Sequence, residues 1–127
     1  MAETFAELYA PLLKEVFTVQ AHQQLDAGAD AMTLASEYAE HGKPDFVLAY
    51  LLLIDVQEEV KRELLAYAYE RRATLSEQKA EALAAQFHRP FPLIKLEAQK
   101  DRLAARQVRQ GRRVRRDTTA PKMFGMN

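Results

Sequence analysis

The sequence predicts an all-α protein, a compact bundle of four to five helices with a long central helix and a basic C-terminal helix and tail. Apolar residues recur at spacings of three and four, as in Phe5, Leu8 and Leu12, which is the period of an amphipathic helix. No segment shows the alternation typical of a strand. Because 127 residues suit one hydrophobic core, we expect a single helical domain over residues 1–116 and a flexible C-terminal tail over residues 117–127.

Start and stop signals divide the first part of the chain into two helices. Thr4 and Glu7 have the spacing of a capping box. Pro11 either kinks the first helix or marks its first turn, and Gly28 is the expected stop. A second, short helix is predicted from an Asp30 cap to Gly42.

The long central helix follows a turn at residues 43–45, with Asp45 as its expected N-cap. Residues 46–54 are apolar on all sides, which predicts burial, and the pattern becomes amphipathic from Asp55. Thr74 and Glu77 form a second capping-box match. Two interpretations therefore stay open: an unbroken helix over residues 46–87, or a break at Thr74.

Two prolines predict a loop at residues 88–92. The last helix is expected to run from Leu93 to about Gln110 or beyond. Gly111 weakens that helix by ~1 kcal/mol relative to Ala but need not end it.

The amino-acid composition excludes several kinds of functional site. The absence of cysteine excludes disulfides, thiolate zinc sites and cysteine nucleophiles. The longest apolar run, residues 46–54, is far shorter than the ~20 residues of a membrane-spanning helix. With no signal-peptide pattern at the N-terminus, we expect a cytoplasmic protein without a membrane span.

Charge is unevenly distributed along the chain. Residues 1–94 hold 8 Lys and Arg against 15 Asp and Glu, a net charge of −7. Residues 95–127 hold 10 basic and 3 acidic residues, a net charge of +7. An acidic body with a basic arm points to an acidic or polyanionic partner.

The basic arm carries a ridge of arginines. Arg102, Arg106 and Arg109 begin a series that continues with Arg113 and Arg116, and a continuous helix would place the five within about 80° of arc. Bidentate guanidinium groups in a row suit phosphate backbones or protein carboxylates. The predicted partner-binding or polyanion-binding set, here called the arginine ridge, is Lys95, Arg102, Arg106, Arg109, Arg112, Arg113, Arg115 and Arg116.

A complementary ridge of acids is predicted on the central helix. On an unbroken helix its members fall within about 40° of arc, and folding back at the proline loop would bring them beside the arginines. The pairing could form within one chain or across a dimer. This glutamate ridge consists of Glu59, Glu63, Glu70, Glu77 and Glu81.

We therefore expect a small non-enzymatic interaction module, an assembly or adaptor protein that uses the two ridges to bind a protein partner or itself as a homo-oligomer. The alternative is non-specific nucleic-acid binding by the arginine ridge, and an enzyme of unnamed chemistry is third. No Glu-x-x-His pair suggests a di-metal site, so no metal or cofactor is predicted. Exposed apolar residues in the tail suggest a docking peptide: Met123, Phe124 and Met126.

Overall fold

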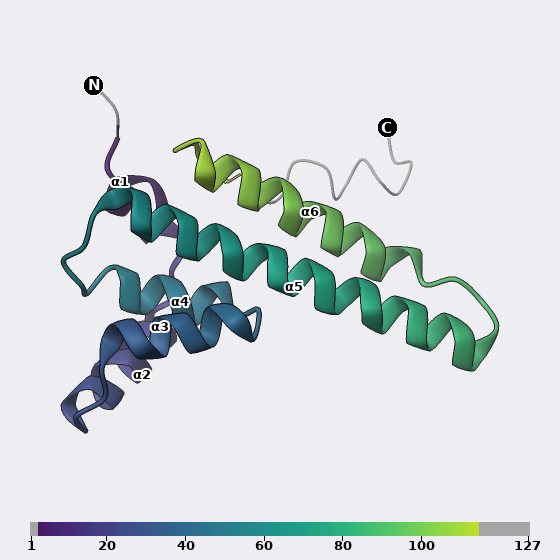
Figure 1. The fold of residues 1–127 in the computed structure, drawn as a ribbon, viewed down its shortest axis with the longest axis horizontal. Helices are drawn as coiled ribbons and strands as arrows, with labels where there is room; N and C mark the ends of the chain where they lie inside the picture. Colours follow the sequence, from purple (N-terminus) through teal and green to yellow (C-terminus); the bar gives the residue numbers. More distant parts are fainter. Residues whose placement is uncertain (1–2, 115–127) are drawn as a thin grey trace.

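The computed structural model describes residues 3–114, and this part of the chain is all-α, as predicted. Six α-helices are present in it, one more than the upper end of the expected range. They are α1 (Phe5–Tyr9), α2 (Glu15–Asp26), α3 (Ala31–Glu40), α4 (Pro44–Leu51), α5 (Glu58–Phe87) and α6 (Pro92–Arg109), with a short 3-10 turn, η1 (Ala10–Leu12), after α1. Figure 1 shows α5 and α6 as a long antiparallel hairpin, with α2–α4 gathered beneath one half of it and α1 beside the start of α5.

The capping-box prediction at the N-terminus is confirmed. The Thr4 amide donates to Glu7 Oε1 at 2.8 Å, and the Glu7 amide donates to the Thr4 hydroxyl at 3.2 Å. Pro11 does not kink one helix. It lies in η1, after which Leu13 is extended and α2 begins at Glu15, so Pro11 separates two helices.

The predicted central helix is wrong at its start. Residues 46–51 belong to α4, and α5 begins only at Glu58. α4 and α5 pack against each other and run in opposite directions, which a single straight helix over residues 46–87 could not do. The all-apolar segment of α4 needs cover on every side, and the turn at residues 52–57 lets α5 supply part of it.

Asp45 and Thr74 do not act as caps. α4 begins at Pro44, whose fixed φ suits the first helical position, and Asp45 lies in the first turn. Thr74 lies inside α5, which is unbroken over its 30 residues, or ~45 Å at 1.5 Å per residue. Buried Ala73 and Ala80 on either side of Thr74 hold this region of α5 in place.

Gly42 brings the α3–α4 turn into close contact with α5. Its φ is +68°, and its amide and that of Lys43 donate to the Ala39 and Tyr38 carbonyls at 3.0 Å each, which closes α3 as predicted. A Cβ at this position would lie 2.8 Å from the Arg72 backbone nitrogen. Only glycine allows this approach without a shift.

The main core lies between α1, α3, α4, the first half of α5 and the end of α6. Aromatic rings extend it toward α2, since Phe46 stacks on Tyr38 at 4.7 Å between centroids and meets the edge of Phe17 at 4.9 Å. Its largest fully buried side chains are Tyr9, Tyr50, Phe5, Leu48, Leu51, Leu65, Val47 and Val108. No helix within residues 3–114 is both long enough and apolar enough to cross a bilayer.

Candidate interaction surface

The arginine ridge is shorter than predicted because α6 ends at Arg109. Gly111 adopts a φ of +68°, and two hydrogen bonds close the helix: its amide to the Val108 carbonyl at 3.0 Å, and the Arg112 amide to the Gln107 carbonyl at 2.8 Å. This pair of bonds is a Schellman motif, in which glycine is favoured. Arg112 and Arg113 therefore leave the helical face. Arg115 and Arg116 lie outside the described residues.

Side chains of the N-terminal segment hold the chain just after Gly111. The Tyr9 hydroxyl donates to the Arg112 carbonyl at 2.6 Å, and burial raises the pKa of Tyr9 to about 12. Arg113 Nη2 lies 3.2 Å from Glu3 Oε2 on the surface, and Val114 packs against the core. The end of the described chain is thus tied to α1 instead of extending α6.

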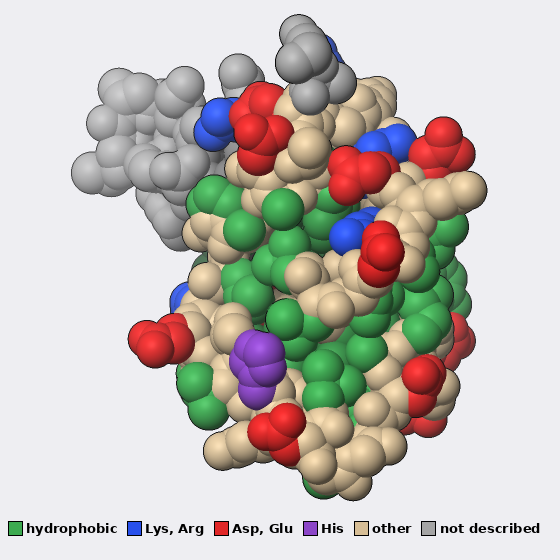
Figure 2. Space-filling view, turned by 90° about the vertical axis from the view of Figure 1, so that its left-hand side faces the viewer, with side chains coloured by type: hydrophobic (Ala, Val, Ile, Leu, Met, Phe, Trp, Pro, Cys, Tyr) green, Lys and Arg blue, Asp and Glu red, His purple; other side chains and the backbone are tan. Residues whose placement is uncertain are grey.

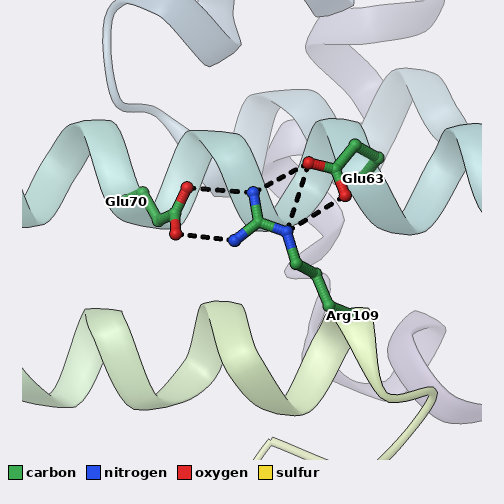
Figure 3. Close-up of polar contacts among 3 residues, drawn as sticks. All are labelled: Glu63, Glu70 and Arg109. Atoms are coloured by element: carbon green, nitrogen blue, oxygen red, sulfur yellow. Dashed lines mark hydrogen bonds and ion pairs between the residues drawn. The ribbon is translucent and has the colours of Figure 1, made fainter.

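Arg109 is the best-paired member of the ridge. Its guanidinium lies between two carboxylates of α5, as Figure 3 shows. Nε and Nη2 donate to Glu63 at 3.0 and 2.8 Å, and Nη1 and Nη2 donate to Glu70 at 2.6 and 2.9 Å. These bonds hold the pKa of both carboxyl groups below their ordinary value and raise the pKa of Arg109.

Arg102 makes the second ridge contact. Its Nε donates to Glu77 Oε2 at 3.3 Å, and its Nη2 is paired with the other oxygen of the same carboxylate. The hydrogen bonds lower the pKa of Glu77 and raise the pKa of Arg102. Three of the five predicted glutamates are therefore paired with two of the predicted arginines, within one chain and across the α5–α6 seam.

Other members of the two ridges are not paired in this way. Within residues 3–114, Glu59, Glu81, Lys95 and Arg106 form no ion pair, and Arg106 is exposed. Lys95 and Glu81 line a polar groove beside Glu77, together with Gln99. Exposed ion pairs contribute ~0–1 kcal/mol each, so the ridges set the register of the hairpin more than its stability.

Sequence reasoning missed the most buried ion pair of the hairpin, between Arg72 and Asp101. Arg72 Nε and Nη2 each donate to one oxygen of Asp101 at 2.8 Å. Burial lowers the pKa of Arg72, but the hydrogen bond and charge of Asp101 outweigh it, so that pKa is raised. The signal was present: Asp101 falls in the same three-to-four spacing as the buried Ala98, Ala105 and Val108, where an acid requires a buried partner.

One side of α5 changes from buried to open along its length. Leu83 lies 18 residues after the buried Leu65, and Phe87 lies 18 residues after the buried Tyr69. A separation of 18 residues is about five full helical turns, so each pair lies on the same side of α5. Leu65 and Tyr69 pack in the main core, whereas Leu83 is half-buried and Phe87 is 53% exposed. Figure 1 shows why: α2–α4 lie beneath the half of the hairpin that contains the start of α5, α1 lies beside that start, and the far half stands clear of all four.

The start of α6 adds apolar residues to this far half. Leu93 is 59% exposed, and it lines an apolar groove with Phe91 and Ile94. Ile94 precedes Asp101 by seven residues and so lies on the side of α6 that carries the Arg72–Asp101 pair. We call Leu83, Phe87, Leu93 and Ile94 the hairpin face.

Within residues 3–114, no group of three or more His, Asp or Glu side chains is placed to hold a metal ion. Asp55, which follows the most apolar stretch of the chain, is exposed in the turn before α5. The Nδ1 atom of His41 lies 2.8 Å from the Glu37 carbonyl oxygen at the end of α3. The predicted docking residues Met123, Phe124 and Met126 lie outside the described part of the chain.

Comparison with known protein families, with curated proteins and with solved structures finds no match to this chain. Its own residues and their geometry carry the functional inference.

Proposed function

We propose that this protein is a small non-enzymatic interaction module, an assembly or adaptor protein that binds another protein chain through the hairpin face. The observation that carries the proposal is the exposure of Phe87 on the side of α5 that is buried five turns earlier. A helix surface that continues a core without cover is typical of a surface that a partner completes.

The two ridges support this function indirectly. Arg102 and Arg109 already bind carboxylates of the same chain, so binding a partner through them would first require breaking these pairs. Their contribution is to hold α6 in register against α5. A rigid hairpin presents its apolar face with little loss of conformational entropy on binding.

Native electrophoresis of extracts from cells that make the protein tests this function. The wild-type chain should migrate in a species larger than its 14.5 kDa monomer. Phe87→Asp should return it to the monomer position, because burying an unpaired charge in an apolar interface is unfavourable. Val60→Asp is the matched control: Val60 is 39% exposed and lies on the opposite side of α5, about 180° from Phe87.

A monomer position for all three proteins would overturn the proposal. Loss of the larger species in Val60→Asp as well as in Phe87→Asp would also overturn the assignment to the hairpin face. Circular dichroism of the purified variants establishes that each is folded.

Nucleic-acid binding is the second candidate, and one observation favours it. Arg106 and Arg112 are exposed and form no ion pair within residues 3–114. Fluorescence anisotropy of a labelled duplex across a salt series tests this candidate. Binding that weakens with salt at a log–log slope of about −0.9 per phosphate contact, and that is lost in Arg106→Glu/Arg112→Glu, would establish it. Absence of binding at low salt would remove it.

A further inference from the structure

We propose that the partner of the hairpin face is a second copy of this chain, and that the two copies form an antiparallel two-fold dimer in which each hairpin face packs on α2 of the other copy. This inference rests on the proposed function and names its partner. Shape, apolar exposure and charge each point to it.

The shape of the chain leaves room for a second copy. Figure 1 shows α2–α4 beneath one half of the hairpin, α1 at the same end beside the start of α5, and nothing of residues 3–114 beneath the other half. Two such angular molecules related by a two-fold axis interlock, because the α1–α4 body of each occupies the open space of the other. The interface is then isologous and closed.

α2 offers the second apolar surface that this arrangement requires. It packs on α4, and Figure 1 shows it on the side of the body remote from α5, which is the side that the two-fold brings toward the partner's hairpin. Val16 and Val19 on α2 are 63% and 48% exposed. Ala21 is its only buried residue, so most of the surface of this helix is uncovered.

Charge complements the apolar match. Residues 3–57, which form the body, hold 9 Asp and Glu against 2 Lys, whereas the far half of the hairpin, residues 75–100, holds 4 Lys and Arg against 3 Asp and Glu. Figure 2, which views the α1–α4 end, shows hydrophobic side chains surrounded by acidic groups, with fewer Lys and Arg groups, mostly in the upper part of the view. Lys79 and Arg89 flank the hairpin face and form no ion pair within the described residues. Packing the hairpin face on the body brings Lys79 and Arg89 toward an acidic surface, whereas packing hairpin on hairpin would leave these two cations without acidic partners.

Analytical ultracentrifugation of the purified full-length chain and its variants tests the dimer. The wild type should sediment with twice the 14.5 kDa mass of the chain. Phe87→Asp and Val16→Asp should each raise the dimer dissociation constant by roughly 30-fold or more, the effect of losing a central apolar contact. Val60→Asp should leave the dissociation constant unchanged.

Mixing the two interface variants tests the reciprocal geometry. In a heterodimer of one Phe87→Asp chain and one Val16→Asp chain, the intact hairpin face of the Val16→Asp chain meets the intact α2 of the Phe87→Asp chain. One of the two symmetry-related contacts is therefore restored. The mixture should therefore associate more tightly than either variant alone. A hairpin-to-hairpin dimer would be insensitive to Val16→Asp and would show no such rescue, and either result would overturn the proposal.

A monomeric purified chain would also overturn the dimer without removing the proposed function. In that case a larger species in extracts that depends on Phe87 would identify a different protein as the partner. A monomer in both experiments would remove the function and the dimer together.

Discussion

Arg72 and Asp101 form a bidentate ion pair that joins α5 to α6, with both nitrogen–oxygen distances at 2.8 Å. Asp101 is only 8% exposed, and the side chain of Arg72 is 37% exposed. Breaking a buried pair leaves one charge uncompensated, which costs more than the pair itself contributes. This pair lies at the middle of the hairpin, where the body ends and the hairpin continues alone.

Asp101→Asn should therefore destabilise the protein clearly. We expect a loss of about 2–3 kcal/mol in the free energy of unfolding, below the full value for a buried pair because Arg72 retains contact with water. Urea unfolding followed by circular dichroism measures it. Glu97→Gln is the control, since Glu97 is exposed and its bond to Lys100 is a surface contact of 3.3 Å. Equal effects of the two substitutions would contradict the structural role of Asp101.

Acid should weaken the α5–α6 seam through the paired glutamates. The folded-state pKa values of Glu63, Glu70 and Glu77 are lowered from an ordinary value of 4.5 by their arginine partners. The unfolded chain therefore binds more protons in this range, and stability must rise with pH. The contribution of these groups is complete above pH 4.5 and is lost as pH falls through their folded-state pKa values.

Unfolding measured between about pH 6 and pH 3 tests this dependence. Replacing the three glutamates by glutamine should flatten the acid limb of the stability profile. Glu59→Gln/Glu81→Gln should leave it in place, because these two residues form no ion pair within residues 3–114. An unchanged acid limb in the triple variant would show that other carboxyl groups determine it.

Gly42→Ala should destabilise the protein more than Gly111→Ala. Both glycines have a φ of +68°, so both substitutions carry the cost of a left-handed alanine, about 1–2 kcal/mol. At Gly42 the new Cβ would also lie 2.8 Å from the Arg72 nitrogen, whereas nothing lies within 4 Å at Gly111. The clash should add about 1–3 kcal/mol. Thermal and urea unfolding of the two variants compares them directly, and equal losses would refute the close approach.

Tyr9→Phe should loosen the end of the described chain. It removes the hydroxyl that donates to the Arg112 carbonyl at 2.6 Å, at an expected cost of about 1 kcal/mol. Hydrogen exchange should show faster exchange at residues 112–114. Normal exchange at these residues would mean that the Arg113–Glu3 contact and the packing of Val114 hold the segment without Tyr9.

Alkali gives a second measure of the Tyr9 contact. Because burial raises the pKa of Tyr9 to about 12 from an ordinary 10.0, the folded state holds this proton longer than the unfolded chain. Stability from Tyr9 is therefore complete below pH 10 and is lost as pH rises toward 12. The pKa values of Tyr50 and Tyr67 are also raised, so spectroscopic titration should show a late phase to which three tyrosines contribute. Tyr9→Phe should make that phase smaller by one tyrosine.

Local signals in the sequence predicted local structure well. Thr4 caps α1, Asp30 caps α3 through the Thr33 amide at 2.8 Å, and Gly28 and Gly42 follow the ends of α2 and α3. Each of these depends on backbone groups within a few residues, so neighbouring side chains decide the outcome. The same is true of the predicted loop at residues 88–92: Pro90 lies in it, and Pro92 begins α6, one residue before the expected start at Leu93.

Two local sequence signals of equal strength did not determine the structure, because tertiary packing selected the conformation at those positions. Thr74 and Glu77 have capping-box spacing but lie inside α5, because Ala73 and Ala80 are buried there. Gly111, judged compatible with a continuing helix, ends α6 because Tyr9 and the core hold residues 112–114 in a turned-back path. Distant contacts selected one of two locally acceptable conformations in each case.

By itself the sequence determined the helical class, most helix ends, and the part of the two charged ridges that α5 and α6 pair, which is Arg102 with Glu77 and Arg109 with Glu63 and Glu70. Only the tertiary structure decided that the apolar segment at residues 46–54 turns back against α5, that Asp101 takes Arg72 as its partner, and that Phe87 stays exposed. The reason is physical: periodicity records which side of a helix is apolar, but whether that side is buried depends on which other helices reach it.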